Sequence, residues 1–450
     1  TLFFPLMRLV WHKISFRAPD LLHEWEKSAK FAVSFEHKKT HRQVYSIAIF
    51  FYMLGIIVAS PFHKKARQMM RGRWESFRIL REKVKAGERY VWFHAASLGE
   101  FEQGRPLMER LRQEHPEYKI LLTFFSPSGY EVRKNYAGAD IICYLPFDTP
   151  GNVKSFFRLV QPEMAFFIKY EFWTNIITAC QRRGIPVYSV SSIFRQNQIF
   201  FRWYGKKYSK VLRRIRHFFV QNEESKELLK GLGISNVTIV GDTRFDRVMD
   251  IQKAAKELPL VEKFRGDAPF TFVAGSSWPP DEDLFIPYFN EHRDMRLIIA
   301  PHVIDEDHLR QIEGKLERPS LRYTQATEEN IGDAECLIID CFGLLSSIYR
   351  YADFAMVGGG FGVGIHNVPE AAVYGIPVII GPNNERFREA QELLASGGCR
   401  EVTDRDEFNS TMNRLIDNER FRKLCGRKCA EYIEGGAGAT EKIYNHVFRH

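Results

Sequence analysis

The sequence predicts an α/β fold with two successive domains, each built around a parallel sheet. From about residue 90 onward, apolar segments of strand length alternate with stretches of helical periodicity, a pattern typical of doubly wound, Rossmann-like sheets. A length of 450 residues also favours two domains over one. A Lys/Glu-rich stretch at residues 249–268 divides the strands into two series and is suited to a linker.

The strand predictions rest on short apolar runs, and helical patterns such as Arg105–Glu114 and Glu224–Leu232 fall between many of them. The first series is expected at Tyr90–Ala96, Lys119–Ser126, Ile141–Pro146, Met164–Lys169, Pro186–Ser192, His217–Asn222 and Val237–Asp242. The second series is expected at Thr271–Ser276, Leu297–Pro301, Cys336–Asp340, Phe354–Gly358 and Pro377–Gly381.

The composition is globular and basic. Hydrophobic residues make up 45% of the chain and charged residues 26%, which carries no signature of disorder. The net charge of +9 favours an anionic partner such as an acidic lipid or a phosphorylated substrate. Nucleic acid is disfavoured, because the basic residues gather beside an apolar segment without a recognisable binding motif. The seven cysteines lack zinc-site spacing, which indicates reduced thiols and no metal centre.

The segment Val44–Ser60 carries no charge, and its length is near the lower limit of the about 17–25 residues that cross a bilayer. The basic residues that follow it up to Arg73 are of the kind that stays in the cytoplasm and attracts anionic headgroups. Residues 44–73 are therefore predicted to be a single-pass anchor with its basic flank. A secretory segment and a buried core helix are the alternatives. Residues 1–43 are expected to be a poorly ordered upstream extension.

A carboxylate follows the first predicted strand. In the segment His94-Ala-Ala-Ser-Leu-Gly-Glu-Phe101, Ser97 and Glu100 have the spacing of a capping box, in which the two side chains satisfy backbone N–H groups at a helix start. The alternative is a carboxylate that faces a ligand, because ligands of open parallel sheets bind beyond the carboxyl ends of the strands. The spacing alone favours the cap.

Two strand-to-helix loops in the second series have residue types that bind phosphate. In the segment 357–372, a strand leads into a glycine-rich loop, and Asn367 and Glu370 then open a helix. Glycines let the backbone approach a ligand closely, and a helix start supplies N–H groups for an anion; the alternative is a capping pair. Ser276 and Ser277, at the end of an earlier strand, suit either a phosphate or a helix cap.

Several common catalytic motifs are missing from the sequence. It has no Walker lysine loop, no H-E-x-x-H, no paired C-x-x-C and no G-x-S-x-G, which disfavours P-loop ATP chemistry, metal hydrolysis and α/β-hydrolase chemistry. The first strand–helix unit also lacks G-x-G-x-x-G, which disfavours a nicotinamide cofactor.

In combination, these motifs resemble the bacterial 3-deoxy-D-manno-octulosonate (Kdo) transferase family of lipid A biosynthesis. The resemblance covers the chain from about residue 45 to the C-terminus. It rests on the segments HAASLGEF at 94–101, SPSGYE at 126–131, YLPFDTP at 144–150, VGGGFGVGIHNVPEAA at 357–372 and GAGAT at 436–440.

The resemblance implies a GT-B glycosyltransferase with two tandem Rossmann-like domains, a cleft between them and an N-terminal membrane anchor helix. The implied reaction is transfer of Kdo, with inversion, from CMP-Kdo to the lipid A precursor lipid IVA at the cytoplasmic face of the inner membrane. Inner membrane lipids are implied as further partners, and no cofactor, metal or nucleic acid is expected. The acceptor domain is expected at residues 74–248, and the CMP-Kdo donor domain, with the C-terminal helices, at residues 269–450.

The resemblance also implies roles for individual residues. Glu100 is implied as the catalytic base. Acceptor binding is implied for Ser97, Gly99, Ser126, Ser128, Gly129 and Glu171. Donor binding is implied for Gly275, Ser276, Ser277, Pro301, His302, Gly343, Gly359, Gly360, His366, Asn367 and Glu370.

Three segments depart from the family pattern. The family's E-T-E-L-W-P-N reads Lys169-Tyr-Glu-Phe-Trp-Thr-Asn175, so that a lysine replaces the first glutamate. The usual P-R-H reads Pro301-His302-Val303, and D-T-x-G-E-L reads Asp340-Cys-Phe-Gly-Leu-Leu345. Two other functions stay open at this point. One is a different membrane-associated GT-B nucleotide-sugar transferase, which binding of UDP rather than CMP would reveal, and the other is a non-catalytic protein that binds anionic lipid.

Overall fold

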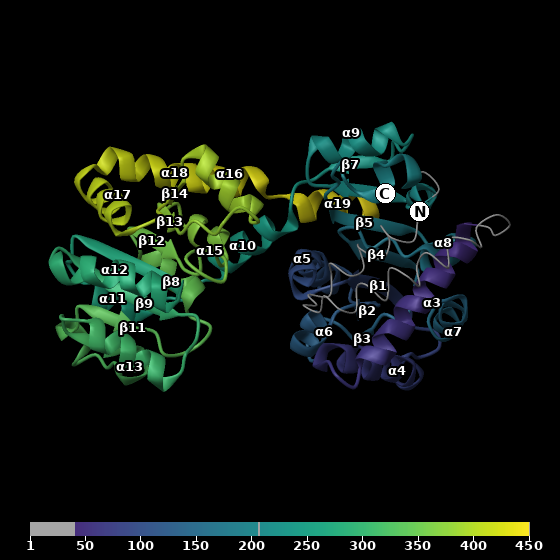
Figure 1. Cartoon of the computed structure of the whole chain (residues 1–450), viewed down its shortest axis with the longest axis horizontal. Coiled ribbons are helices and arrows are strands. Elements are labelled where there is room, and N and C mark those ends of the chain that lie inside the picture. The colour runs from purple at the N-terminus through teal and green to yellow at the C-terminus, as the bar shows by residue number, and fades with distance from the viewer. Residues whose placement is uncertain (1–40, 206–207, 450) are drawn as a thin grey trace. The chain divides into compact units, whose positions relative to one another are not determined.

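The computed structural model describes residues 41–205 and 208–449 and divides into two compact units (Figure 1). The first unit holds the chain up to Arg244 and the residues from Gly438 onward, and the second spans Phe245–Ala437. Each unit has one seven-stranded sheet whose neighbouring strands all run parallel. The predicted α/β fold with two parallel sheets is therefore confirmed. Residues 1–40 of the extension predicted at residues 1–43 lie outside the described residues.

The first sheet has the strand order β3-β2-β1-β4-β5-β6-β7. The order reverses between β1 and β4, and ligands of such sheets bind beyond the carboxyl ends of the strands at this reversal. Every predicted strand of the first series is present, with ends that differ by up to three residues. The strands are β1 Arg89–Ala95, β2 Tyr118–Phe124, β3 Ile141–Tyr144, β4 Met164–Ile168, β5 Val187–Ser192, β6 His217–Val220 and β7 Val237–Ile239.

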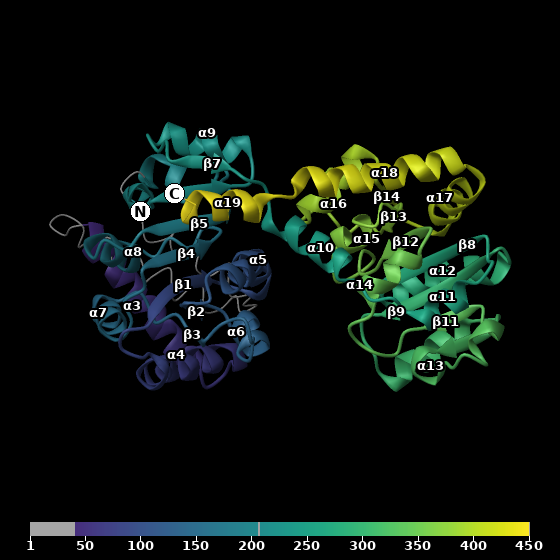
Figure 2. The same cartoon turned by 180° about the vertical axis from the view of Figure 1, so that it is seen from behind.

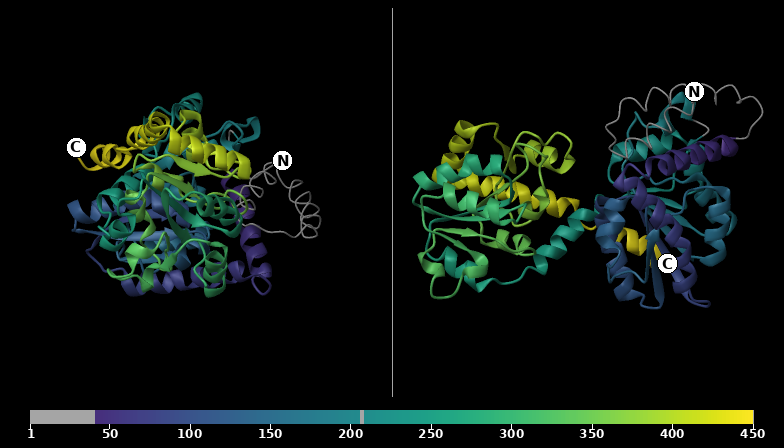
Figure 3. Two further views of the ribbon diagram at one scale, coloured as in Figure 1. Left: turned by 90° about the vertical axis from the view of Figure 1, so that its left-hand side faces the viewer. Right: turned by 60° about the horizontal axis from the view of Figure 1, so that its bottom comes forward.

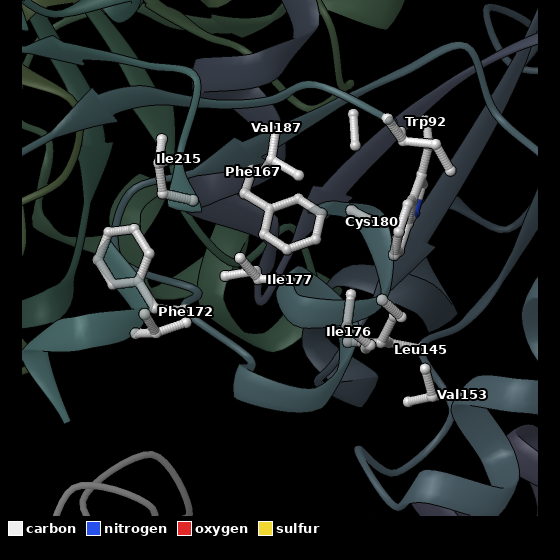
Figure 4. Packing of buried hydrophobic residues seen from close by; sticks show 14 of the residues in the cluster. Trp92, Leu145, Val153, Phe167, Phe172, Ile176, Ile177, Cys180, Val187 and Ile215 are labelled. Carbon is white, nitrogen blue, oxygen red and sulfur yellow. The ribbon is translucent and has the colours of Figure 1, made fainter. Parts of the chain in front are cut away.

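Apolar side chains fill both faces of this sheet. On one face, Trp92 and Phe167 of the strands lie in one core cluster with Ile177 of α8 (Figure 4). On the other face, Phe93 packs in a cluster with Phe101 of α5. The helices of the first unit are α3 His41–Ala59, α4 Lys64–Lys83, α5 Leu98–Glu114, α6 Pro127–Arg133, α7 Pro150–Leu159, α8 Thr174–Arg182, α9 Glu223–Gly231 and α19 Ala439–Phe448, with 3-10 helices at Ile199–Phe201, Trp203–Gly205 and Ser209–Arg214.

The last helix, α19, belongs to the first unit and not to the second, where the sequence places it. Its Ile443 and Tyr444 are buried in the same core cluster as Phe101, and the guanidinium of Arg110 on α5 lies 4.4 Å from the centre of the Tyr444 ring. Figure 3 shows this helix, in yellow, among the blue elements of the first unit. An amphipathic helix does not reveal in its sequence which core will cover its apolar face.

The second sheet has the order β10-β11-β9-β8-β12-β13-β14. Figure 2 shows the chain from behind, with most strands of this sheet labelled. All five predicted strands are present, and two edge strands, β10 and β14, are additional. Three residues at a sheet edge are too few to show a hydrophobic pattern. The strands are β8 Phe270–Ser277, β9 Met295–Pro301, β10 Ser320–Arg322, β11 Cys336–Ile338, β12 Phe354–Val357, β13 Val378–Ile380 and β14 Cys399–Glu401.

The stretch predicted as a linker, residues 249–268, is mostly helical and belongs to the second unit. Val248, Val261 and Phe264 are buried in the core of that unit. The apolar residues of the stretch therefore form helices that pack on the core, although the stretch is rich in Lys and Glu. The helices of this part of the chain are α10 Thr243–Lys253, α11 Pro259–Arg265, α12 Pro279–Glu291, α13 Glu306–Lys315, α14 Leu345–Ile348, α15 Val368–Ala372, α16 Arg388–Ser396, α17 Arg405–Asp417 and α18 Glu419–Gly436, with 3-10 helices at Tyr323–Gln325, Ile331–Asp333 and Tyr349–Tyr351.

The apolar segment predicted as an anchor forms α3, and one side of this helix packs on the first unit. The Tyr45 hydroxyl donates a hydrogen bond to Asp148 at 2.7 Å, and the Tyr52 ring stacks on Phe125 with 6.2 Å between centroids. In the described part of the chain, no single helix is long and apolar enough to cross a membrane. The stretch Tyr45–Ala59 meets that test only together with α4, across a bend of 119°.

Candidate active site

Glu100 lies in the first turn of α5, directly after β1, and is buried to 7% exposure. Its Oε2 accepts a hydrogen bond from the backbone N–H of Ala96 at 2.5 Å, while its own N–H donates to the Ser97 hydroxyl at 3.5 Å. These are the reciprocal contacts of a helix cap, displaced by one residue on the glutamate side. The capping geometry is therefore present. It leaves a carboxylate at the positive end of α5, beyond the carboxyl end of a central strand, where such sheets bind ligands.

The residues predicted to bind the acceptor gather around this helix start. The Ser126 N–H donates to the carbonyl of Ala96 at 2.8 Å, and the Ser126 hydroxyl caps α6 by accepting from the N–H of Ser128. A Cβ on Gly129 would lie 3.1 Å from the backbone of Ser97. The two loops are thus in contact. Among the described residues, a Cβ on Gly99 would meet nothing within 4 Å, and Gly99 is exposed, so the surface at this neighbour of Glu100 is open.

Glu171 is in a different environment from the one expected of an acceptor ligand. Its side chain is 2% exposed, and its Oε2 accepts from the Trp173 indole at 3.1 Å. The Nε2 of His94 lies 3.5 Å from the same oxygen, while Nδ1 of that ring lies 2.9 Å from the Thr123 hydroxyl. Glu171 and His94 therefore form a buried polar layer within the first unit.

A second buried carboxylate, Asp242, follows β7 and accepts several hydrogen bonds near the carboxyl ends of the strands. It accepts from the amides of Gln103 and Gln221, each at 3.0 Å, and from the guanidinium of Arg244 at 2.7 and 3.1 Å. Gln103 lies on α5 one turn after Glu100. Through it, Asp242 connects the helix that carries Glu100 to the start of α10. No local sequence pattern predicts this network, because Gln103 and Asp242 lie 139 positions apart.

In the second unit, the glycine-rich loop folds back on Asp281. The Asp281 Oδ2 accepts from the N–H groups of Trp278 and Gly359 at 2.9 and 2.8 Å. Its Oδ1 is buried and has no hydrogen-bond partner among the described residues. Burial raises the pKa of Asp281 to about 6. Sequence reasoning missed this residue as a site residue, although an acid three positions after Trp278 has the spacing of a capping box.

An aromatic stack stands beside this loop. The ring of His302 stacks on both Trp278 and His366, with centroid separations of 5.0 and 4.1 Å. The Trp278 indole N–H donates to Nε2 of His366 at 2.9 Å, which requires an unprotonated Nε2. Burial, and then the nearby His302, lower the pKa of His366 to about 4. The stack therefore joins His302 and His366, which were predicted to bind the donor, to Trp278, which was not.

Asn367 and Glu370 contact each other and do not form the expected cap. The Asn367 side chain makes no capping hydrogen bond to α15. Instead, its amide donates to Oε1 of Glu370 at 2.6 Å. Asn367 is exposed and Glu370 is half-buried, so the pair lies at the surface of the second unit.

The other predicted donor residues divide between the loops and the core. Ser276 has a left-handed backbone with φ of 54°, and Ser277 is buried with its hydroxyl donating to Glu282 at 3.0 Å. A Cβ on Gly275 would collide with the Tyr349 hydroxyl, so internal packing requires this glycine. Pro301 is the last residue of β9. Gly343 lies in an exposed turn, and Gly360 packs against Gly381.

Comparison with known proteins adds to this geometry. Residues 71–247 match the model of a family described as 3-deoxy-D-manno-octulosonic-acid transferase (kdotransferase). Over 372 residues, the chain is 26% identical to the 3-deoxy-D-manno-octulosonic acid transferase of Aquifex aeolicus, a match that covers 79% of this chain and 97% of that protein. By these matches, the chain is similar to the Kdo transferase family.

Solved structures show the fold of this chain. UDP-GlcNAc 2-epimerase from Neisseria meningitidis has a TM-score of 0.56 at 15% identity and covers 80% of this chain and 100% of its own. MurG from Acinetobacter baumannii has a TM-score of 0.52 at 10% identity, with the same coverage. At this identity the likeness shows a GT-B-like fold alone. The family match contains Glu100, Lys169 and Asp242.

Proposed function

We propose that the chain transfers Kdo from CMP-Kdo to the lipid A precursor, with inversion at the anomeric carbon. The observation that carries the proposal is the family match across the unit that contains Glu100, together with the position of that carboxylate beside an open surface. The similarity to the family supports these substrates. The geometry of Glu100 supports its role in the chemistry.

Glu100 is the proposed general base. The acceptor hydroxyl loses its proton to the carboxylate as its oxygen attacks the anomeric carbon, and the bond from that carbon to the CMP phosphate breaks in the same displacement. The N–H of Ala96 and the positive end of α5 stabilise the charged carboxylate before the reaction. The cap and the base are therefore two roles of one group, since the contact with Ala96 also fixes the direction of the side chain.

The second unit is the proposed donor unit. Its loop at residues 357–372 offers backbone N–H groups for a nucleotide phosphate, and the stack of His302 and His366 offers aromatic faces for the base. The N–H of Gly359 already donates to Asp281, so this glycine shapes the loop. The Asn367 and Glu370 pair is the proposed contact with the ribose hydroxyls, because an exposed amide and a half-buried carboxylate at the surface can donate to and accept from hydroxyl groups.

The outer side of α3 is the proposed membrane contact. Phe50, Leu54 and Val58 are 51%, 42% and 62% exposed at helical spacing, while the opposite side of the helix is buried on the first unit. A helix held in this way lies in the plane of the membrane interface, with its apolar side among the acyl chains. This arrangement is an alternative to the single-pass anchor expected from the sequence.

Basic residues near α3 extend this contact. Phe62, which follows α3, is 82% exposed, and Lys64, Lys65, Arg67 and Arg71 of the predicted flank are exposed. Arg73 is not available to headgroups. It is buried, and its guanidinium donates to the carbonyl of Phe125 at 2.9 Å.

The transfer reaction can be tested directly with purified protein. CMP-Kdo and the tetraacylated lipid A precursor are incubated with the protein, and the lipid is analysed by mass spectrometry. The expected product is the precursor with one or more added Kdo residues. Parallel incubations with UDP-sugars separate the alternative: product from a UDP-sugar and none from CMP-Kdo would overturn the proposal.

A further inference from the structure

Lys169 lies at the end of β4, in the strand next to β1. Its backbone is left-handed, with φ of 58°, a conformation that is uncommon for a residue with a long side chain and that clusters at functional sites. The surrounding structure imposes it. The Lys169 N–H donates to Val190 at 2.8 Å, and its carbonyl accepts from the hydroxyls of Ser189 and Ser192 at 3.0 and 2.7 Å.

The ammonium group of Lys169 is half-buried, and within the described part of the chain it makes no hydrogen bond and no ion pair. Burial, and then the positive charge of Arg244, lower its pKa, whereas Glu100 and Asp242 raise it. Asp242 is already bound by Arg244 and two amides, so it does not neutralise the lysine. Because the ammonium group has no hydrogen-bond or ion-pair partner in the described part of the chain, it is suited to bind an anion that arrives with a ligand.

Arg244, the arginine beside Lys169, is held in place by a network of hydrogen bonds. Ser191, at the end of β5, is also left-handed, with φ of 51°. Its hydroxyl lies 2.8 Å from the hydroxyl of Thr243, which donates to the carbonyl of Gln103 at 2.5 Å. These contacts fix the start of α10, where the N–H of Arg244 donates to Asp242 at 3.0 Å. Arg195, exposed after β5, adds a third positive charge within electrostatic reach of Lys169.

We propose that Lys169, with Arg244 and Arg195, binds an oxyanion of a substrate beside Glu100. The inference rests on the proposed function. The bound oxyanion is a phosphate or a sugar carboxylate. A phosphate would come from the lipid acceptor, and a carboxylate would come from the Kdo donor. The resemblance described for the sequence implies a glutamate at this position, so Lys169 reverses the expected charge beside Glu100.

The test compares three variants with the wild-type protein. Lys169→Met removes the charge and keeps an unbranched side chain, so the cost of the left-handed backbone is unchanged. Lys169→Arg keeps the charge. The matched control is Lys154→Met, which removes an exposed charge from α7. Binding of the lipid A precursor is measured by calorimetry in detergent without donor, for the phosphorylated lipid and for the same lipid after phosphatase treatment, and KM for CMP-Kdo is measured separately.

A single lost charged contact weakens binding by about tenfold or more. If the acceptor phosphate is the ligand, Lys169→Met loses this factor for the phosphorylated lipid and nothing for the phosphatase-treated lipid. If the donor carboxylate is the ligand, the same factor is seen in KM for CMP-Kdo. In either case, the lipid affinity and the KM of Lys169→Arg stay within about threefold of the wild-type values. Those of Lys154→Met equal the wild-type values. Equal losses on both lipids, or no loss on lipid or donor, would overturn the proposal.

Folding of the variants is followed by thermal melting. If Lys169→Met does not fold, Arg195→Gln carries the test, because Arg195 is exposed, and a loss of about threefold confined to the anionic ligand is expected. The lipid-binding measurement does not need turnover. A protein that binds the lipid phosphate through Lys169 but transfers no Kdo would refute the proposed function and retain the anion site.

Discussion

The Trp278 indole donates a hydrogen bond to His366 Nε2 at 2.9 Å, and this contact joins the strand end of β8 to the glycine-rich loop of the second unit. The bond exists only while Nε2 of His366 is unprotonated. The histidine therefore couples the shape of the proposed donor loop to pH.

We expect the stability of the second unit to fall as the pH is lowered from about 6.5 toward 4. In that window, unfolded His366 binds a proton, while folded His366, with a pKa near 4, does not. The unfolded state thus gains protons, and acid favours it. Replacing His366 by Gln should flatten this dependence. Calorimetric melting at pH 7 and pH 5 provides the measurement.

Asp281 titrates in the opposite sense, because its folded pKa is raised to about 6. The comparison of wild type with His366→Gln cancels this contribution, since both proteins contain Asp281. An equal change in melting temperature between pH 7 and pH 5 in both proteins would show that His366 is not the responsible group.

The surface pair in the second unit leads to a prediction about donor affinity. Glu370→Gln should weaken CMP binding by about tenfold, because a ribose hydroxyl would lose a charged acceptor. It should change the melting temperature little, since Asn367 makes no capping bond to α15. Isothermal titration with CMP tests the first part and calorimetric melting tests the second. Intact affinity with reduced stability would assign Glu370 a structural role instead.

The membrane contact is tested by changing the outer side of α3 alone. Replacing Phe50, Leu54 and Val58 together by Ser should reduce binding to vesicles of anionic lipid by at least about tenfold, because each apolar side chain contributes roughly 1 kcal/mol or more on burial. Stability should be retained, because these side chains are exposed. Cosedimentation with vesicles provides the measurement.

Val132→Ser is the matched control for this experiment. Val132 is 57% exposed on α6, so its replacement removes apolar surface from another part of the first unit. Vesicle binding that is equally weakened by the control, or unchanged by the triple replacement, would contradict an in-plane α3. Deletion of residues 1–60 is a poor substitute, because it would expose Phe125 and the other residues that Tyr52 covers.

The strands of both sheets could be predicted because buried parallel strands read as continuous apolar runs, as Val91–Phe93 and Ile298–Ala300 do. The edge strand Ser320–Arg322 is short and only partly covered, so its sequence carries no such pattern. The assignment of α19 also needed the structure, since the contact of Tyr444 with α5 is set by tertiary packing.

The candidate site was predictable to the extent that it lies in strand-to-helix loops. Glu100 follows β1 directly and could be found from local sequence. Asp242 and Lys169 could not be assigned to the same region, because only the strand order brings the ends of β1 and β4 and the start of α10 together. Arg73 looked like one more basic residue of the flank, but it is buried because α4 packs its inner side against Phe125 and Phe147.

The central claim is that Glu100 is the base for transfer, and one measurement tests it most directly: the rate of Kdo transfer from CMP-Kdo to the lipid A precursor by Glu100→Gln. The amide oxygen of Gln can still accept from the N–H of Ala96, so the helix start and the fold are preserved, while proton acceptance is lost. Glu102→Gln is the control, because Glu102 lies on the same helix and pairs with Arg133 at 2.8 Å. We predict that Glu100→Gln binds both substrates, melts like the wild type and transfers Kdo at least about a hundredfold more slowly, with the control near the wild-type rate. Near-normal transfer by Glu100→Gln would show that the carboxylate is only a cap.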